Sequence, residues 1–232
     1  MTITQFSDNF ISLWLEDSQH IRERYSELVA KEGLTSARSI GERTEERDFR
    51  FFERLFEQVS IQSNYSILDI GCGKGELRDY LSLRFPNMSY SKYLGIDIVP
   101  TFISTNQQKI PSTEFQLVNF IDPSFKPENK FDIVLALGLL VTRVRHYESF
   151  VEYFVKKMVK CAKKYVLFNV ISYIEPSSSN YSDPKGVGHS TILNTNILQS
   201  IVDSICCYNC RLEPYNIFPD ATDLFVQIQL ER

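Results

Sequence analysis

The sequence predicts an α/β domain built on a mostly parallel sheet, preceded by a helical segment. From residue 66 onward, short apolar runs typical of strands alternate with amphipathic stretches typical of helices. The first apolar run leads into three closely spaced glycines and then into a helical pattern, the arrangement of a ligand-binding strand–turn–helix unit. Such an alternation indicates a parallel sheet covered by helices on both faces.

The N-terminal part of the chain is helical in pattern. Residues 4–31 carry apolar side chains mostly three or four positions apart, and Gly33 follows as a stop signal. Residues 42–59 repeat the pattern, with phenylalanines set among alternating Arg and Glu. We expect residues 1–60 to form a helical cap or lid and residues 61–232 to form the main domain. Core packing explains both apolar stripes most simply, and a lid over a ligand is the functional alternative.

Seven strands and four further helices are expected after residue 60. The expected strands are SILDI (66–70), YLGIDI (93–98), EFQLVNF (114–120), FDIVLAL (131–137), KYVLFNVIS (164–172), RLEPYNIFP (211–219) and TDLFVQIQLE (222–231). The expected helices cover residues 75–85, a segment that begins near residue 100, residues 146–164 and residues 194–205. No helix separates the last two strands, which are therefore expected to form an antiparallel hairpin. The irregular stretch 175–190 is either a substrate loop or a tolerated surface insertion.

Composition excludes several classes of protein. The net charge of −4 gives no basic field for a large phosphate-backbone footprint. No apolar run reaches the roughly 18 residues that cross a bilayer, and the first 20 residues lack a secretion signal, so a cytoplasmic protein is expected. Five cysteines do not indicate a disulfide framework. The CxxC formed by Cys207 and Cys210 has no second ligand pair, so no metal site is expected.

The glycine-rich segment LDIGCGKGEL is the most informative stretch. A strand delivers Asp69 to its carboxyl end, and Gly71, Gly73 and Gly75 then permit a tight turn and a close approach of backbone amides to a ligand. A P-loop requires Ser or Thr after the lysine, and here a glycine follows it. A dinucleotide fingerprint requires GxGxxG, and here a glutamate stands at the final glycine position. Both of these nucleotide sites are therefore disfavoured.

The remaining pattern, (D/E)xGxGxG, matches Asp69 to Gly75 position by position. In this segment the sequence resembles the class I S-adenosylmethionine-dependent methyltransferases. The resemblance extends over residues 61–232 at the level of fold, and its specific motifs lie within about 65–140. It implies a Rossmann-like, seven-stranded, mostly parallel sheet with strand order 3-2-1-4-5-7-6 and the seventh strand antiparallel. It also implies S-adenosyl-L-methionine as cofactor and S-adenosyl-L-homocysteine as product.

The resemblance also assigns cofactor contacts. Asp97 ends the second strand, where a carboxylate can accept both hydrogen bonds of a ribose diol; the alternative is an aspartate that caps the following helix. Ile98 would cover the adenine, and Asn119 stands where the family usually has Asp and would accept from the adenine amino group. The complete set of expected cofactor residues is Asp69, Gly71, Cys72, Gly73, Gly75, Asp97, Ile98, Asn119, Phe120, Ala136, Leu137 and Gly138.

Catalytic residues are sought on loops that follow the fourth and fifth strands. His146 is the first candidate for a general base because imidazole titrates near neutral pH, and the alternative is a surface histidine at a helix start. Arg143 is a candidate anchor for an acidic substrate, and Tyr173 is a further catalytic candidate.

The expected function is methyl transfer to an oxygen or nitrogen nucleophile of a small molecule or peptide, by in-line displacement. The segment ALGLLVTR lacks the Asn/Asp-Pro-Pro-aromatic motif of nucleic-acid amino-methyltransferases, so a nucleic-acid acceptor is disfavoured. Two alternatives stay open. The chain could be a cofactor-binding partner subunit without catalysis, or, less favoured, an NAD-dependent oxidoreductase.

Overall fold

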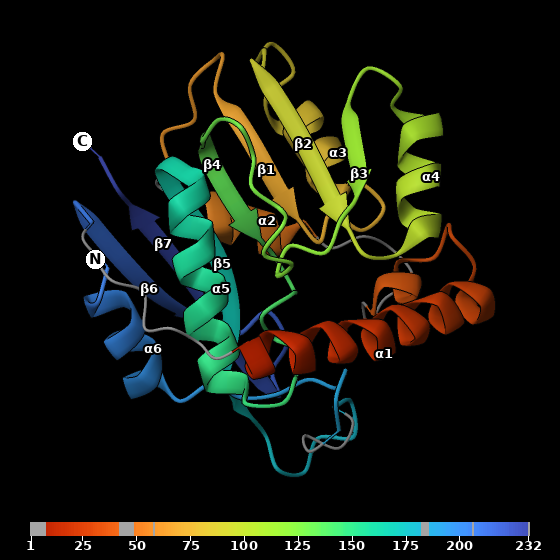
Figure 1. Ribbon diagram of the computed structural model, residues 1–232, viewed down its shortest axis with the longest axis vertical. Coiled ribbons are helices and arrows are strands. Elements are labelled where there is room, and N and C mark those ends of the chain that lie inside the picture. The colour runs from red at the N-terminus through yellow and green to blue at the C-terminus, as the bar shows by residue number, and fades with distance from the viewer. Residues whose placement is uncertain (1–7, 42–48, 58, 182–185, 206, 232) are drawn as a thin grey trace.

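Seven strands form one sheet at the centre of the molecule (Figure 1). The computed structural model describes residues 8–41, 49–57, 59–181, 186–205 and 207–231. The strands are β1 (Ser66–Ile70), β2 (Lys92–Asp97), β3 (Glu114–Leu117), β4 (Phe131–Ala136), β5 (Ala162–Ile174), β6 (Asn209–Tyr215) and β7 (Ala221–Gln229). Their order is β3-β2-β1-β4-β5-β7-β6. Neighbouring strands from β3 to β5 pair in parallel, and β7 pairs antiparallel with both β5 and β6. The predicted sheet is confirmed.

In the predicted stretch 42–59 the described helix covers only Arg50–Phe56, whereas the other α-helices lie where the periodicity predicted them. The helices are α1 (Asp8–Glu32), α2 (Arg50–Phe56), α3 (Glu76–Arg84), α4 (Pro100–Lys109), α5 (Tyr147–Cys161) and α6 (Thr195–Asp203), with a short 3₁₀ helix η1 (Ala37–Ile40). The predictions for residues 4–7, 42–48 and 58 lie outside the described residues. Two helix starts follow ordinary rules. Pro100 stands in the first turn of α4, and the Asn194 side chain accepts from the Asn196 amide at 2.8 Å to cap α6.

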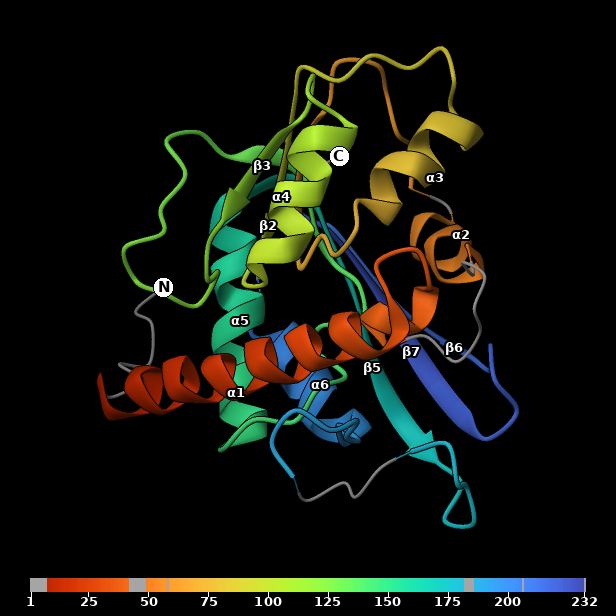
Figure 2. The ribbon, with the colours of Figure 1, turned by 90° about the vertical axis from the view of Figure 1, so that its right-hand side faces the viewer.

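Alternating side chains of the strands build two apolar layers. On β1, Leu68 packs in a cluster with α5 and α6, whereas Ile67 packs with α2 and α3 on the opposite face. The same alternation separates Phe168 from Leu167 on β5. All four side chains are fully buried. Figure 2 shows the sheet between its two helical layers, which is why the central strands read as continuous apolar runs.

Helix α1 runs across the carboxyl ends of the parallel strands (Figures 1 and 2). Its Trp14 is fully buried in the same apolar cluster as α5, and the Trp14 indole donates to the Arg145 carbonyl at 2.8 Å. Asp17, also buried, accepts from the backbone N–H and the Nε of Arg145, both at 2.7 Å. These contacts attach α1 to the loop between β4 and α5. The division of the chain into a cap and a main domain at residue 60 stays a prediction.

The stretch 175–190, apart from residues 182–185, which are not described, is tied to its surroundings. Ser178 donates to Asp220 Oδ2 at 2.6 Å, and the Arg143 amide donates to the His189 carbonyl at 2.8 Å. None of the described helices is long and apolar enough to cross a membrane.

Candidate functional site

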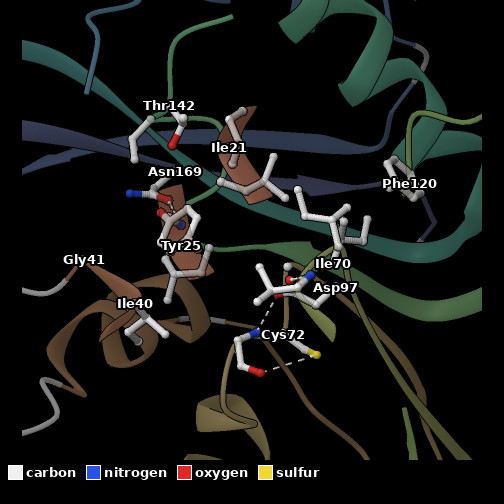
Figure 3. A pocket seen from close by; sticks show the side chains of 18 of the residues that line it. Ile21, Tyr25, Ile40, Gly41, Ile70, Cys72, Asp97, Phe120, Thr142 and Asn169 are labelled. Atoms are coloured by element: carbon white, nitrogen blue, oxygen red, sulfur yellow. Dashed lines mark hydrogen bonds between the residues drawn. The ribbon is translucent and has the colours of Figure 1, made fainter. Parts of the chain in front are cut away.

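A cavity of about 360 Å³ lies at the carboxyl ends of the parallel strands and is bounded in part by residues of α1. This volume falls in the range of small-molecule sites. Residues from α1, from the glycine turn, from the ends of β1 and β2, from the turn after β4 and from within β5 line the cavity. Figure 3 shows Tyr25, Thr142 and Asn169 on one side of the cavity and Asp97 and Cys72 on the other. The site therefore lies where a doubly wound sheet places its ligands.

The glycine turn is docked onto the end of β2. The amides of Gly71 and Cys72 donate to the Ile96 carbonyl at 2.8 and 3.0 Å. Gly71 and Gly73 have φ angles of 72° and 50°, which side chains with a Cβ rarely adopt. A Cβ added to Gly71 would lie 2.9 Å from the side chain of Leu139, which itself lines the cavity. The turn thus requires glycine both for its backbone conformation and for space.

Gly75 has a different position from the other two glycines. It is the N-cap of α3 at φ 79°, and it is not among the described residues that line the cavity. An added Cβ would meet Asn106 Oδ1 at 3.2 Å. Within the glycine turn, Gly71, Cys72 and Gly73 therefore line the cavity. Gly75 is outside the described lining and begins α3.

Asp97 lies at the end of β2 and is buried against the glycine turn. Its Oδ2 accepts from the Gly73 amide at 3.0 Å, and its Oδ1 accepts from the Val99 amide at 2.9 Å. Burial raises the pKa of Asp97 to about 6, although these backbone hydrogen bonds favour its charged form. An ionised carboxylate offers about four acceptor positions, so two amides leave capacity for a ligand. Val99 is the N-cap of α4, so Asp97 forms a turn before the helix rather than its cap, and this contact is compatible with a ligand-binding role.

Asp69 ends β1 behind the turn. Its Oδ2 accepts from the Tyr93 hydroxyl at 2.6 Å, and both side chains are buried. Burial raises the pKa of Asp69 to about 7, with smaller contributions from Glu76 and Asp97 in the same direction. Asp69, Glu76 and Asp97 all line the cavity, which gives this end of the cavity acidic character.

The adenine-side candidates follow β2 and β3. Ile98, Asn119 and Phe120 all line the cavity. Asn119 Oδ1 accepts from the Ile121 amide at 3.3 Å, and Phe120 packs against Phe154 with ring centroids 4.8 Å apart. The polar group and the apolar surface that an adenine contact requires are thus adjacent.

The candidates after β4 divide into two groups. Leu137 and Gly138 line the cavity, whereas Ala136 is fully buried within β4 and is not among the described lining residues. The Gly138 amide donates to Asn169 Oδ1 at 2.8 Å. A side chain of β5 therefore holds the turn that follows β4.

Lys74 and Glu76 connect the glycine turn to the N-terminal segment. Lys74 Nζ donates to the Ser36 carbonyl at 2.6 Å and lies 3.9 Å from Glu76 Oε1. The Lys74 amide donates to Glu76 Oε2 at 2.8 Å. Both side chains are almost fully buried, which is rare for charged residues without partners. In a P-loop the lysine after the glycines binds a phosphate. Here Lys74 instead holds the segment before η1 through its hydrogen bond to Ser36.

Further polar residues that the sequence did not assign to the cofactor also line the cavity. They are Ser18, Arg24, Tyr25, Thr142, Asn169, Ser190 and Asp223. Burial raises the pKa of Tyr25, whose hydroxyl is hydrogen-bonded to the Thr142 side chain. Asp223 interrupts the apolar β7 run as an acidic side chain that is only 4% exposed. An acid in a buried strand is a sequence signal that could have indicated it.

The three catalytic candidates are not brought to the cavity. None of them is among the described lining residues. His146 is exposed at the start of α5, with its ring 4.6 Å from that of Phe10. Tyr173 is 47% exposed and donates to Glu175 Oε2 at 2.7 Å, and Arg143 Nη1 donates to Thr191 Oγ1 at 3.4 Å. Their catalytic roles stay untested predictions, and their placement does not favour them.

The cysteines are reduced in the described part of the chain. Cys72, Cys161, Cys207 and Cys210 each carry a thiol outside any disulfide. Burial raises the pKa of Cys72 well above its ordinary value, so this lining residue presents a thiol rather than a thiolate. Among the described residues, no group of three or more His, Cys, Asp or Glu side chains is placed to hold a metal ion.

Known proteins match the segment that carries this site. A family model described as a methyltransferase domain matches residues 68–161, from β1 through α5. The 235L protein of Invertebrate iridescent virus 6, named as a methyltransferase, is 28% identical over 123 residues, which cover 52% of this chain and 44% of that protein. Trans-aconitate 2-methyltransferase of Escherichia coli O1:K1 / APEC is 29% identical over 96 residues, or 41% and 36% of the two chains. The chain spans less than half the length of these curated relatives.

A solved structure extends the likeness in fold to almost the whole chain. Magnesium protoporphyrin IX methyltransferase from Synechocystis PCC 6803, with bound S-adenosylhomocysteine, has a TM-score of 0.61 at 13% identity and covers 93% of this chain and 100% of its own. At this identity the likeness concerns the fold alone. The matching segment contains the glycine turn, Asp97 and Asn119, which meet at one cavity. The strand order and the matched segment agree: residues 68–161 are similar to a methyltransferase domain, and the chain has the fold of the class I S-adenosylmethionine-dependent methyltransferases.

Proposed function

We propose that the chain transfers the methyl group of S-adenosyl-L-methionine to an oxygen or nitrogen nucleophile of a small molecule or peptide. One observation carries the proposal. The glycine turn and the Asp97 carboxylate are hydrogen-bonded to one another at the wall of a cavity of cofactor size. The turn would hold the amino-acid part of the cofactor, and Asp97 would accept from the ribose hydroxyls. Asn119 and Phe120 would lie beside the adenine.

The residues present fit this cofactor. The glycine turn brings backbone to the cavity where a Cβ would collide with Leu139. Asp97 supplies a buried carboxylate, and the acidic surroundings from Asp69 and Glu76 suit a ligand that carries ammonium and sulfonium charges. The acidic side chains, the space at the glycine turn and the Asp97 carboxylate therefore support S-adenosyl-L-methionine as the ligand of this cavity.

When bound, the cofactor supplies a methyl group that is activated on a sulfonium. The chain contributes orientation of the acceptor and exclusion of water, which suffice for much of the rate of such a displacement. Helix α1 covers the cavity with Ile21 and Tyr25, and η1 is fastened to the glycine turn by Lys74. The proposal does not require His146, Arg143 or Tyr173 as a general base.

A binding measurement tests the proposal first. Calorimetric titration with S-adenosylmethionine, S-adenosylhomocysteine and NAD should show binding of the two adenosyl ligands only. A transfer assay with a radiolabelled methyl group and a panel of amines and alcohols should then give labelled product. Preferential binding of NAD would overturn the cofactor assignment and revive the oxidoreductase alternative. Tight adenosyl binding without transfer to any acceptor would instead favour the non-catalytic partner subunit.

A further inference from the structure

Asp223 is a buried acidic residue of the cavity that is not among the expected cofactor contacts. It lies on β7 in register with Ile171 of β5 and Tyr215 of β6, and it is 4% exposed. Its side chain lines the same cavity as the glycine turn, but from the opposite part of the sheet. Strands β4 and β5 separate β7 from β1, so Asp223 is remote from Asp97 along the sheet.

Asn169 fixes the orientation of this carboxylate. Asn169 Nδ2 donates to Asp223 Oδ1 at 2.9 Å, and Asn169 Oδ1 accepts from the Gly138 amide at 2.8 Å. Because one end of the amide must accept and the other must donate, the two hydrogen bonds allow only one orientation of the amide. Asp223 therefore presents an oxygen acceptor, and its position is coupled to the turn after β4.

The surroundings of Asp223 are mostly apolar. Phe51, Ile171, Tyr181 and Phe218 line the cavity. The Phe51 ring lies 6.1 Å from the rings of Phe218 and Phe225, and Phe225 shares the strand face of Asp223. A ligand at this end thus meets one oriented oxygen acceptor within an aromatic and aliphatic wall.

The charges that line the cavity restrict the ligand further. Asp69, Glu76, Asp97 and Asp223 face it, whereas Arg24 is the basic side chain among the described lining residues. Arg24 Nη1 donates to the Gly188 carbonyl at 2.7 Å, which directs it to the loop after β5. A carboxylate ligand would offer no hydrogen to Asp223 and would add a like charge in a poorly solvated space.

We propose that Asp223, oriented by Asn169, is the specificity residue of the acceptor site and selects a small, largely apolar amine or alcohol. The N–H or O–H of the acceptor donates to the Asp223 carboxylate, and the apolar body packs against Phe51 and Phe218. Acceptors that present a carboxylate are rejected. This inference rests on the proposed function, because the acceptor and the cofactor share the cavity.

Three probes that share a 2-phenylethyl group and differ in the polar group test the inference: 2-phenylethylamine, 2-phenylethanol and 3-phenylpropanoate. Binding of each probe to the protein saturated with S-adenosylhomocysteine is measured by calorimetry or by ligand-observed NMR. We expect the amine and the alcohol to bind at least about tenfold more tightly than the carboxylate. Asp223→Asn should reduce amine binding by about tenfold and leave S-adenosylhomocysteine binding unchanged.

Asp223→Asn preserves shape, since the introduced amide oxygen still accepts the hydrogen bond from Asn169. The matched control is Asp220→Asn, because Asp220 accepts from Ser178 and Asn180 and is not among the described lining residues. This control should bind all probes as the unaltered protein does, and equal melting temperatures verify that both variants fold.

Three results would overturn the inference: a preference for the carboxylate, unchanged amine binding in Asp223→Asn, or no binding of any probe to the loaded protein. Failure of S-adenosylhomocysteine itself to bind would instead count against the proposed function. The two failures are therefore distinguishable.

Discussion

The Gly73 amide donates a hydrogen bond of 3.0 Å to Oδ2 of Asp97. These residues lie 24 positions apart, one in the glycine turn and one at the end of β2. The hydrogen bond places the carboxylate at the wall of the cavity before any ligand enters. A group held in its working position loses little conformational entropy when a ligand binds.

Replacement of Asp97 should weaken cofactor binding more than it weakens the fold. Asp97→Ala removes the carboxylate that we propose accepts two ribose hydrogen bonds, and we expect the affinity for S-adenosylhomocysteine to fall by about 30-fold or more, about 2 kcal/mol. Asp97→Asn keeps one acceptor oxygen and should lose less. Calorimetry measures both affinities. Glu114→Gln, at an exposed position on β3, is the control, and an Asp97→Ala variant of unchanged affinity would contradict the ribose assignment.

Asp69 should make the stability of the ligand-free protein depend on pH. Its folded-state pKa of about 7 exceeds the ordinary value of 3.8 because the carboxyl is buried, so the folded protein binds more protons between these values. The contribution of Asp69 to the free energy of unfolding is therefore complete below about pH 4 and is lost as the pH rises through about 7, by about 4 kcal/mol in total.

Urea denaturation at about pH 5 and pH 7.5 measures this dependence. The difference between the two pH values should be smaller in Asp69→Asn, which has no titrating group at this position. Carboxyl groups distant from Asp69 contribute equally to both proteins and cancel in the comparison, and the interactions of Asp69 with Glu76 and Asp97 are smaller than the burial effect. An identical pH dependence in the two proteins would show that Asp69 does not titrate in this window.

The attachment of α1 should depend on Asp17. Asp17→Leu removes the acceptor of two Arg145 hydrogen bonds, and we expect the free energy of unfolding to fall by about 2 kcal/mol. The matched control is Glu16→Leu, since Glu16 is exposed and accepts a single hydrogen bond from Arg145. Urea denaturation compares the two variants. Equal stability losses would mean that the buried Asp17 contacts are not what fastens α1.

Two glycines with similar backbone conformations should respond differently to alanine. Gly71 and Gly33 have φ angles of 72° and 78°, so Gly71→Ala and Gly33→Ala should each cost about 1 kcal/mol through backbone strain. A Cβ at Gly33 meets nothing within 4 Å, whereas one at Gly71 displaces Leu139 at the cavity wall. Only Gly71→Ala should therefore lower the affinity for S-adenosylhomocysteine, as measured by calorimetry. A similar loss in Gly33→Ala would refute this explanation.

The fold and the cofactor end of the cavity could be predicted from the sequence because their signals are local. A strand can be predicted from a few consecutive side chains, and a positive φ at Gly71 or Gly73 is a property of the turn itself. Asp97 could be located because a parallel strand delivers its last residue to the same edge as the glycine turn. Short-range patterns and one topological rule were sufficient for these predictions.

The proposed acceptor end of the cavity depends on contacts between segments that are distant in the chain. Asn169 joins Gly138 and Asp223, which lie 31 and 54 positions away from it, and no periodicity in the sequence marks such a connection. The direction of a loop side chain is also set by packing, as His146 shows in lying against Phe10 rather than in the cavity. The sequence by itself determined the sheet, the glycine turn and the position of Asp97. Only the tertiary structure decided which side chains of α1, β5 and β7 meet at the acceptor end, because that depends on how the helices pack across the strand ends.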